Sequence, residues 1–229
     1  MIKSCVTIAL VPQIKTGPWI YWNDLEKSMA KAAALGFDAI ELFTSSPDAI
    51  DVATLSNLLI KYKLELAAVG TGAGKVIHGL TLTDVNEAIR EKAVSFITDM
   101  ISFGAKFGAP AIIGSMQGNI AAGIERSQAL DWLSEGLTRL DKHAQLNGVK
   151  LIYEPLNRYE TNLLNTIAEG AAYLSTLKTT NTNLLADLFH MNIEETDIAE
   201  SISKFSTFIG HVHFADSNRK PIGFGHTEM

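Results

Sequence analysis

Three apolar segments in the second half of the sequence lead into residues that can bind a metal ion or move a proton. The segment LIYEPLNRYE places Glu154 directly after its apolar run, NLLADLFHMN carries Asp187 and His190, and GHVHFADSNR carries His211 and His213. Carboxylate oxygens combined with imidazole nitrogen suit Mn²⁺, Mg²⁺ or Co²⁺ better than a thiolate-type structural zinc site would. Buried carboxylates are costly to desolvate without a cation or partner, so the three segments together predict a metal site.

Each of these residues also has an ordinary structural interpretation. His211, taken alone, is more often a hydrogen-bonded interior residue of a strand, Asp187 could cap the following helix, and Glu154 could pair with Arg158. Period-two alternation places His211 and His213 on the same face of their strand. The clustering at consecutive strand ends, rather than any one residue, favours a functional site.

A repeated junction of helix, glycine and short β-branched run precedes these segments. It recurs in AALGFDAIEL, KFGAPAIIG and QLNGVKLIYE, where Gly36, Gly108 and Gly148 stand at positions that favour a left-handed residue after a helix. Helix starts are predicted where a capping residue is followed three positions later by glutamate, as in Asn23 with Glu26 and Asp84 with Glu87.

The alternation of helices and strands predicts an α/β fold with parallel strands, most simply a (β/α)₈ TIM barrel formed by residues 1–229 as a single domain. Strands are expected at about 4–10, 37–44, 64–70, 110–114, 149–155, 183–188 and 207–215. A closed barrel has eight strands, so the eighth β/α unit is expected to be missing from this chain. A doubly wound sheet is also compatible with the alternation.

Composition narrows the class of protein. The chain has 229 residues, 47% hydrophobic and 19% charged, and a net charge of −6, which is ordinary for a globular enzyme and argues against a nucleic-acid partner. Cys5 is the only cysteine, so a reducing, cytoplasmic location is expected. No apolar run approaches the roughly 18 residues of a membrane span. Apolar helix faces are compatible with a homo-oligomer.

Three motifs resemble those of a known family. EPLNRYE, DLFHMNIEE and HVHFADSNRKPIGFGH look like the motifs of the xylose-isomerase-like TIM-barrel sugar isomerases and epimerases, and most of all like the ketose (tagatose/psicose) 3-epimerase branch. The resemblance extends through VGTGAGKVIHGLTLTD to nearly the whole chain. It implies the metal ligands Glu154, Asp187 and His213 and the substrate contacts Glu160, His190 and Arg219.

The resemblance implies a metal-dependent sugar epimerase, with Mn²⁺ the favoured ion, that acts next to the carbonyl of a ketose or keto-sugar. Epimerisation at C3 would pass through an enediolate, with Glu154 as one of two acid/base groups and His190 and Arg219 as donors to the developing oxyanion. The family's fourth ligand and second acid/base is a glutamate on strand eight. We expect that partner in the eighth unit, outside these 229 residues.

Three alternative functions are compatible with the same motifs. An aldose–ketose or hydroxypyruvate-type isomerase uses the same ligands but shifts the carbonyl. An endonuclease IV-like metal phosphodiesterase needs more histidines than the six present, and a net charge of −6 disfavours it. A non-catalytic sugar-binding barrel is supported by the missing glutamate alone.

Other polar or aromatic segments are less informative. VGTGAGKV lacks the spacing of a phosphate-binding loop and is interpreted as a turn and lid. Trp19, Tyr21 and Trp22 are as compatible with a wall for a sugar as with packing against the first helix. Ser115 and Gln117 offer neutral hydrogen bonds to a substrate.

Overall fold

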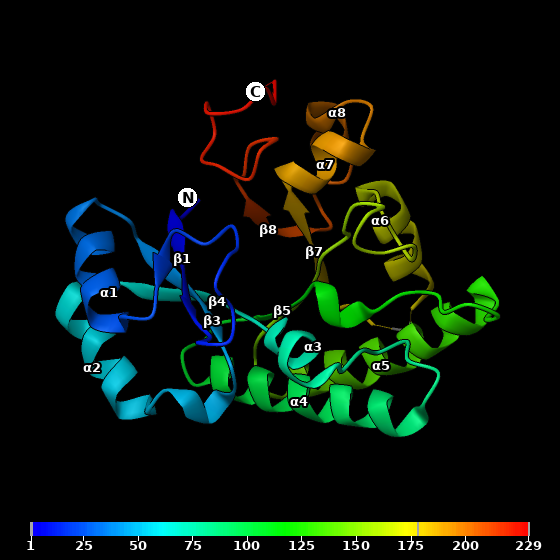
Figure 1. Cartoon of the computed structure of the whole chain (residues 1–229), viewed down its shortest axis with the longest axis horizontal. Coiled ribbons are helices and arrows are strands. Elements are labelled where there is room, and N and C mark those ends of the chain that lie inside the picture. The colour runs from blue at the N-terminus through cyan, green and yellow to red at the C-terminus, as the bar shows by residue number, and fades with distance from the viewer. Residues whose placement is uncertain (1, 178, 229) are drawn as a thin grey trace.

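The structure is a computed structural model that describes residues 2–177 and 179–228. Its centre is one curled sheet of parallel strands (Figure 1). The strands are β1 (Cys5–Leu10), β2 (Tyr21–Trp22), β3 (Ala39–Thr44), β4 (Glu65–Gly70), β5 (Ala111–Ile113), β6 (Leu151–Tyr153), β7 (Thr182–Asp187) and β8 (Ile209–His213). All seven predicted strands are therefore present, each shorter than or equal to its predicted range.

The strand order is β2-β1-β3-β4-β5-β6-β7-β8, which is the order of a TIM barrel rather than of a doubly wound sheet. The two-residue strand β2 was not predicted, because two residues carry no periodicity. It pairs with β1 in parallel, with Ile8 opposite Tyr21. β2 and β8 form the two edges of the sheet within the described residues.

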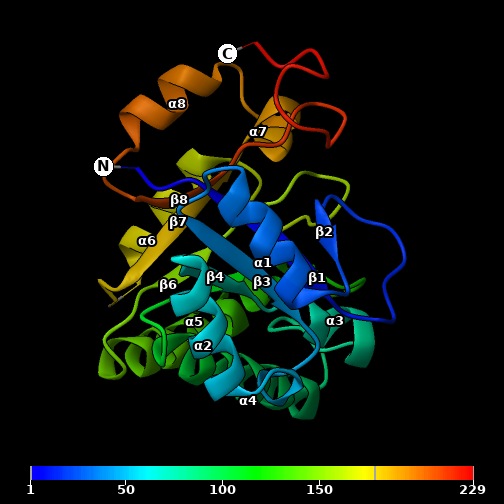
Figure 2. The same cartoon turned by 90° about the vertical axis from the view of Figure 1, so that its left-hand side faces the viewer.

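Helices cover the outer face of the curled sheet (Figures 1 and 2). They are α1 (Leu25–Ala34), α2 (Val52–Tyr62), α3 (Ala73–His78), α4 (Glu87–Ala105), α5 (Arg126–Leu146), α6 (Ile167–Thr176), α7 (Leu188–Glu194) and α8 (Ile198–Lys204), with the short 3₁₀ helices η1 (Pro47–Ala49) and η2 (Ser115–Gln117). Among the described residues no helix is long and apolar enough to cross a bilayer.

The apolar core has two parts. The larger part lies between the sheet and the helices and contains residues such as Leu133 and Leu137 of α5. The smaller part consists of one side chain from each of four neighbouring strands, namely Ala68, Ile112, Ile152 and Leu185. These four side chains mark the inward face of the sheet, and residues two positions further along each strand point the same way.

The junction glycines behave as predicted, whereas the helix caps are displaced. Gly36, Gly108 and Gly148 have φ of +84°, +69° and +71°, which L side chains rarely adopt. The caps of α1 and α4 are Asp24 and Asn86, whose side chains accept from the backbone N–H groups of the first helical turns. Capping residues stand close together at these sites, so spacing alone did not select the right one.

Candidate active site

The inward face of the sheet directs Glu154 and Asp187 to one point. Ile152 and Leu185 belong to the inner apolar group, and Glu154 and Asp187 lie two residues after them. Glu154 is 8% exposed and Asp187 is 5% exposed. The structure thus places two buried carboxylates side by side at the carboxyl ends of β6 and β7, where TIM-barrel sites are built.

Two histidines complete this cluster. Nδ1 of His213 lies 3.3 Å from Oδ2 of Asp187 and 3.8 Å from Oε1 of Glu154. Nε2 of His190 lies 3.8 Å from the same Oε1 of Glu154. Four of the six predicted site residues therefore converge, and their separations are close to those of ligands that share one cation.

The structure tests the two ordinary interpretations, helix capping by Asp187 and an ion pair between Glu154 and Arg158. Asp187 does cap a helix, because its Oδ1 accepts from the backbone N–H of Phe189 at 2.8 Å, yet its Oδ2 remains directed at His213. Arg158 pairs with Glu194 at 2.8 Å instead of with Glu154. The capping interpretation and the site interpretation of Asp187 are compatible, since each uses a different carboxylate oxygen.

Burial and charge set the protonation of the cluster. Burial, with the nearby Asp187 carboxylate, raises the pKa of Glu154 to about 8. Burial opposes charge at both Asp187 and His213, but their mutual attraction lowers the pKa of Asp187 and helps to raise that of His213. Glu154 therefore holds a proton at neutral pH in the metal-free protein. A divalent cation would offset the cost of burying the ionised carboxylates. This set of oxygen and nitrogen donors therefore fits a metal ion.

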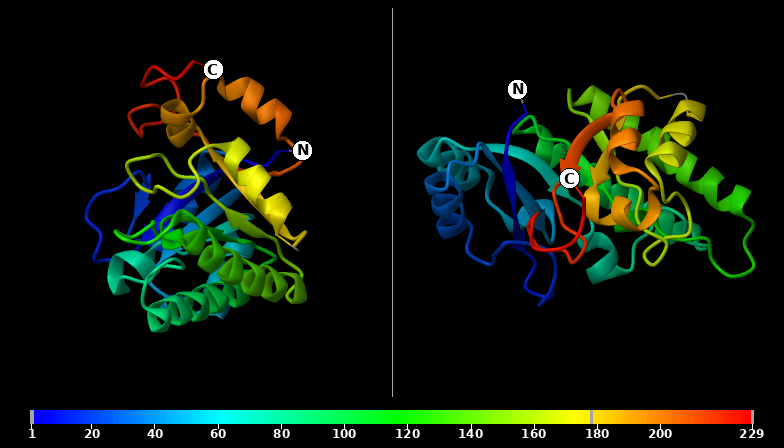
Figure 3. Two further views of the ribbon diagram at one scale, coloured as in Figure 1. Left: turned by 90° about the vertical axis from the view of Figure 1, so that its right-hand side faces the viewer. Right: turned by 90° about the horizontal axis from the view of Figure 1, so that it is seen from above.

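Arg219 and Glu160, the other two predicted substrate contacts, form an ion pair at the rim of the cluster. The guanidinium of Arg219 also stacks on the ring of Phe189, with its carbon 3.9 Å from the ring centroid. Arg219 lies in the C-terminal segment, drawn in red beside α7 (Figure 3). Asp216 holds that segment together by accepting backbone N–H groups, including that of Gly225 at 2.8 Å. Arg219 is thus fixed beside His190 by stacking, pairing and its loop.

Sequence reasoning assigned Gln117 to the substrate, and the structure corrects this interpretation. The Gln117 side chain is fully buried and donates to the carbonyl oxygens of Gly114 at 3.0 Å and Glu154 at 2.9 Å. It therefore braces the ends of β5 and β6. The segment VGTGAGKV, interpreted as a turn and lid, leads into a helix instead, because residues 73–78 form α3.

Sequence reasoning missed Glu41, a 4% exposed carboxylate of β3. Its Oε2 lies 3.0 Å from Nε2 of His211 and 3.2 Å from Nε2 of His213. Burial opposes ionisation, but the His213 charge and the two histidine hydrogen bonds hold the pKa of Glu41 well below its usual range. A signal was available, since AIELFT places a carboxylate inside an apolar strand just as LIYE does.

Aromatic side chains lie near the ends of β1 and β3. The ring of Trp19 stacks on Phe43 with centroids 4.5 Å apart, and it meets Trp22 edge-on at 5.3 Å. Phe43 belongs to β3 and contacts the loop after β4, because a Cβ on Gly72 would lie 3.1 Å from its ring. Trp19 thus packs against Phe43 of β3 and against Trp22, while the sugar-wall interpretation and the packing against the first helix both stay predictions.

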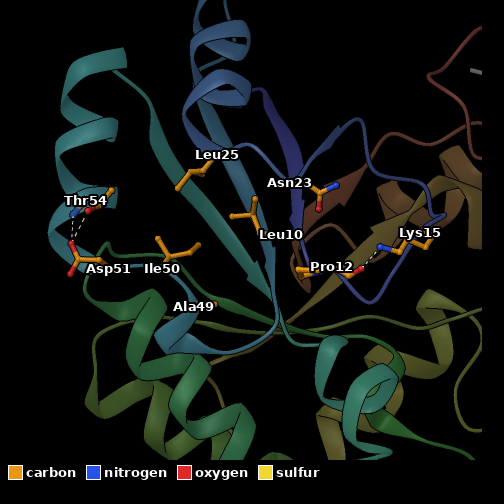
Figure 4. Close-up of a pocket in the computed structure, with 9 residues that line it drawn as sticks. All are labelled: Leu10, Pro12, Lys15, Asn23, Leu25, Ala49, Ile50, Asp51 and Thr54. Atoms are coloured by element: carbon orange, nitrogen blue, oxygen red, sulfur yellow. Dashed lines mark hydrogen bonds between the residues drawn. The ribbon is translucent and has the colours of Figure 1, made fainter.

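A hollow of about 670 Å³ lies between the loop after β1 and the start of α2 (Figure 4). Leu10, Asn23 and Ile50 are among its lining residues. Its charged groups are satisfied locally, since Asp51 accepts from the backbone of Thr54 and Lys15 donates to a carbonyl of the same loop. It shares no lining residue with the carboxylate and histidine cluster.

The sequence was compared with protein-family models and with curated proteins, and both comparisons give matches over most of the chain. The family model described as "Xylose isomerase-like TIM barrel" matches residues 29–229. The chain belongs to this family. Among its curated relatives, the L-ribulose 3-epimerase of Methylomonas sp. (strain DH-1) is 31% identical over 207 residues, which are 89% of this chain and 70% of that protein. The D-psicose 3-epimerase of Agrobacterium fabrum is 30% identical over 219 residues, which are 92% of this chain and 71% of that protein.

A solved structure extends the comparison to the fold. The D-psicose 3-epimerase of Clostridium cellulolyticum H10, crystallised with D-tagatose, superposes with a TM-score of 0.80 at 25% identity. The superposition covers 98% of this chain and 77% of that one. These matches confirm the predicted fold class and the predicted place among the epimerases of this family, which are isomerases.

Proposed function

We propose that this protein is a metal-dependent epimerase that inverts C3 of a ketose or keto-sugar. The observation that carries the proposal is the convergence of Glu154, Asp187 and His213 at neighbouring strand ends, where both carboxylates are buried. The relatives, which are ketose 3-epimerases, support the choice of reaction. Mn²⁺ is the ion we expect for this mixture of oxygen and nitrogen donors.

In this proposal Glu154, Asp187 and His213 hold the ion, which when bound acts as a Lewis acid that stabilises negative charge on the substrate's oxygens. Glu154 also removes the proton from C3. Its Oε1 faces His190 and His213, whereas its Oε2 lies 2.5 Å from the point where a Cβ on Gly114 would stand. We assign proton transfer to Oε2 on that basis.

His190 and Arg219 supply hydrogen bonds to the substrate. Nδ1 of His190 accepts from the backbone N–H of Asn157, so the hydrogen of the neutral ring lies on Nε2, which faces Glu154. Arg219 brings a guanidinium whose direction is fixed by Phe189 and Glu160. A neutral donor and a fixed cation next to the base favour an enediolate over the ketose ground state.

Hydrogen exchange at C3 in D₂O tests the proposal. D-psicose and L-ribulose incubated with the Mn²⁺-loaded protein are expected to gain deuterium at C3, as seen by NMR, and EDTA should stop the exchange. Glu154→Gln should also abolish it. Exchange needs one base on one face, whereas inversion needs a second proton donor on the other face, so product configuration is recorded separately.

The same experiment separates the alternatives. An aldose–ketose isomerase would place deuterium next to a shifted carbonyl and form an aldose. A phosphodiesterase or a non-catalytic sugar-binding barrel would give no exchange with any ketose. Undiminished C3 exchange in Glu154→Gln would remove Glu154 from the reaction, and absence of exchange in the Mn²⁺-bound protein would overturn the proposed activity.

A further inference from the structure

Glu41 is a buried carboxylate to which the proposed reaction gives no role. Its side chain reaches from β3 across the inside of the curled sheet to β8, and these two strands are not neighbours in the sheet. Thr7 Oγ1 donates to its Oε1 at 3.1 Å, and its Oε2 faces the Nε2 atoms of His211 and His213. A carboxylate that is 4% exposed needs hydrogen-bond partners, and Thr7, His211 and His213 satisfy both of its oxygens.

The two ring nitrogens of His213 face different groups. Nε2 lies 3.2 Å from Glu41, and Nδ1 lies 3.3 Å from Asp187 on the side of the proposed ion. Because an ionised carboxylate only accepts hydrogen bonds, the nitrogen that faces Glu41 must carry a hydrogen. The hydrogen on Nδ1, which faces Asp187 in the metal-free protein, would be lost when an ion binds on that side, and Nδ1 would then offer its lone pair to the ion. Histidine ligands in proteins are commonly oriented by a carboxylate in this way.

We propose that Glu41 is the positioning residue of the metal site: by accepting the Nε2–H of His213, it fixes the ring so that Nδ1 is directed at the space between Asp187 and Glu154. This inference rests on the proposed function, because it presumes an ion in that space. His211 supports the arrangement, since its Nε2 lies 3.0 Å from the same oxygen and restrains the Glu41 side chain.

Glu41 is not a further ligand of the same ion. It lies on the Nε2 side of the His213 ring, whereas Asp187 and Glu154 lie on the Nδ1 side. The rival to a positioning role is a second ion bound by Glu41, His211 and His213, whose ligand atoms lie within 4.8 Å of one another. The number of ions bound per chain distinguishes the two.

Calorimetric titration of the metal-free protein with Mn²⁺ tests the proposal. The wild type should bind one ion per chain, and Glu41→Gln should bind one ion about 10- to 100-fold more weakly. Glu65→Gln is the matched control, because Glu65 lies on the adjacent strand β4 but is exposed and paired with Lys3, and its affinity should equal that of the wild type.

Each other result has a distinct meaning. Equal affinity in Glu41→Gln and wild type overturns the positioning role and leaves the proposed function intact. Two ions per wild-type chain, with one lost in Glu41→Gln and the other unaffected, also overturns it. A wild type that binds no ion removes the proposed function and this inference together.

A second measurement does not use the Glu41→Gln variant. In the Mg²⁺-loaded wild type, ¹⁵N-labelled histidine should show one N–H for His213, identified by its loss in His213→Asn, and located on Nε2. An N–H on Nδ1 would contradict the proposal. Catalytic activity is not used in either measurement, so inactivity from another cause cannot mimic either result.

Discussion

The backbone N–H of Asn157 donates to Nδ1 of His190 at 3.1 Å, and the side-chain nitrogen of Asn157 lies 2.7 Å from the same atom. Two donors on Nδ1 leave the hydrogen of the neutral ring on Nε2. Burial lowers the pKa of His190, which keeps the ring neutral at physiological pH. His190 thus faces Glu154 with an N–H group rather than with a positive charge or a lone pair.

This arrangement predicts that His190 serves the reaction rather than the metal. His190→Leu removes the N–H donor and should slow C3 exchange by about 10²- to 10³-fold, as removal of an oxyanion donor does elsewhere. The Mn²⁺ affinity, measured by calorimetry, should stay near that of the wild type. Loss of Mn²⁺ binding in this variant would instead identify His190 as a ligand, which its distance of 3.8 Å from Glu154 Oε1 also permits.

The pKa of Glu154 predicts how the stability of the metal-free protein depends on pH. The folded pKa of about 8 lies above the ordinary value of 4.5, so the native state binds the extra proton between these values. The free energy of unfolding should therefore fall as pH rises from about 5 to about 8. The raised pKa of His213 acts in the same direction, since that proton is also lost as pH rises. The lowered pKa of His190 acts in the opposite direction up to about pH 6.5, so the contribution of Glu154 is read from the difference between the wild type and Glu154→Gln.

Urea unfolding in EDTA at a series of pH values measures this dependence. Glu154→Gln has no proton to lose, so its stability should fall less steeply, and it should exceed that of the wild type at pH about 8. The lowered pKa values of Glu41 and Asp187 add a constant amount to the free energy of unfolding between about pH 5 and pH 8, because both groups are ionised throughout that pH range. A wild type that gains stability over the same range would contradict the prediction.

The fold could be predicted from the sequence because several strands, such as β3, β5 and β6, are buried on both faces and so appear as apolar runs that follow a glycine. The cluster of polar residues at the ends of β6, β7 and β8 could be predicted, since polar residues directly after apolar runs are unusual. Glu41 was missed because its partners, His211 and His213, are 170 and 172 residues away in the sequence and meet it only when the sheet curls. Gln117 was assigned wrongly because a side chain's direction in a loop has no period.

Arg219 provides a prediction about substrate binding. Arg219→Lys keeps the charge but loses the planar group that stacks on Phe189, which contributes about 0.5–2 kcal/mol in comparable pairs. The KM for the ketose should rise by about 3- to 30-fold with little change in Mn²⁺ affinity. Arg158→Lys is the control, because Arg158 is exposed and pairs with Glu194. Equal KM values in the two variants would exclude a substrate role for Arg219.

Gly114 leaves the space that the Glu154 carboxylate occupies. A Cβ at position 114 would lie 2.5 Å from Oε2 of Glu154, closer than non-bonded atoms approach. The obstructed atom is the end of a flexible side chain, so Gly114→Ala should displace the carboxylate at little cost to the free energy of unfolding. A displacement of about 1 Å should slow C3 exchange by about 10²-fold.

Gly104→Ala should show the opposite pattern and serves as the control for Gly114→Ala. There a Cβ would lie 2.6 Å from the backbone carbonyl oxygen of Ala109, which cannot turn aside as a carboxylate can. Overpacking of this kind costs about 1–3 kcal/mol of unfolding free energy, while the folded variant should retain its exchange rate. Stability from urea unfolding and exchange from NMR separate the two effects. If Gly114→Ala lost stability but kept its exchange rate, the space beside Oε2 would have no part in proton transfer.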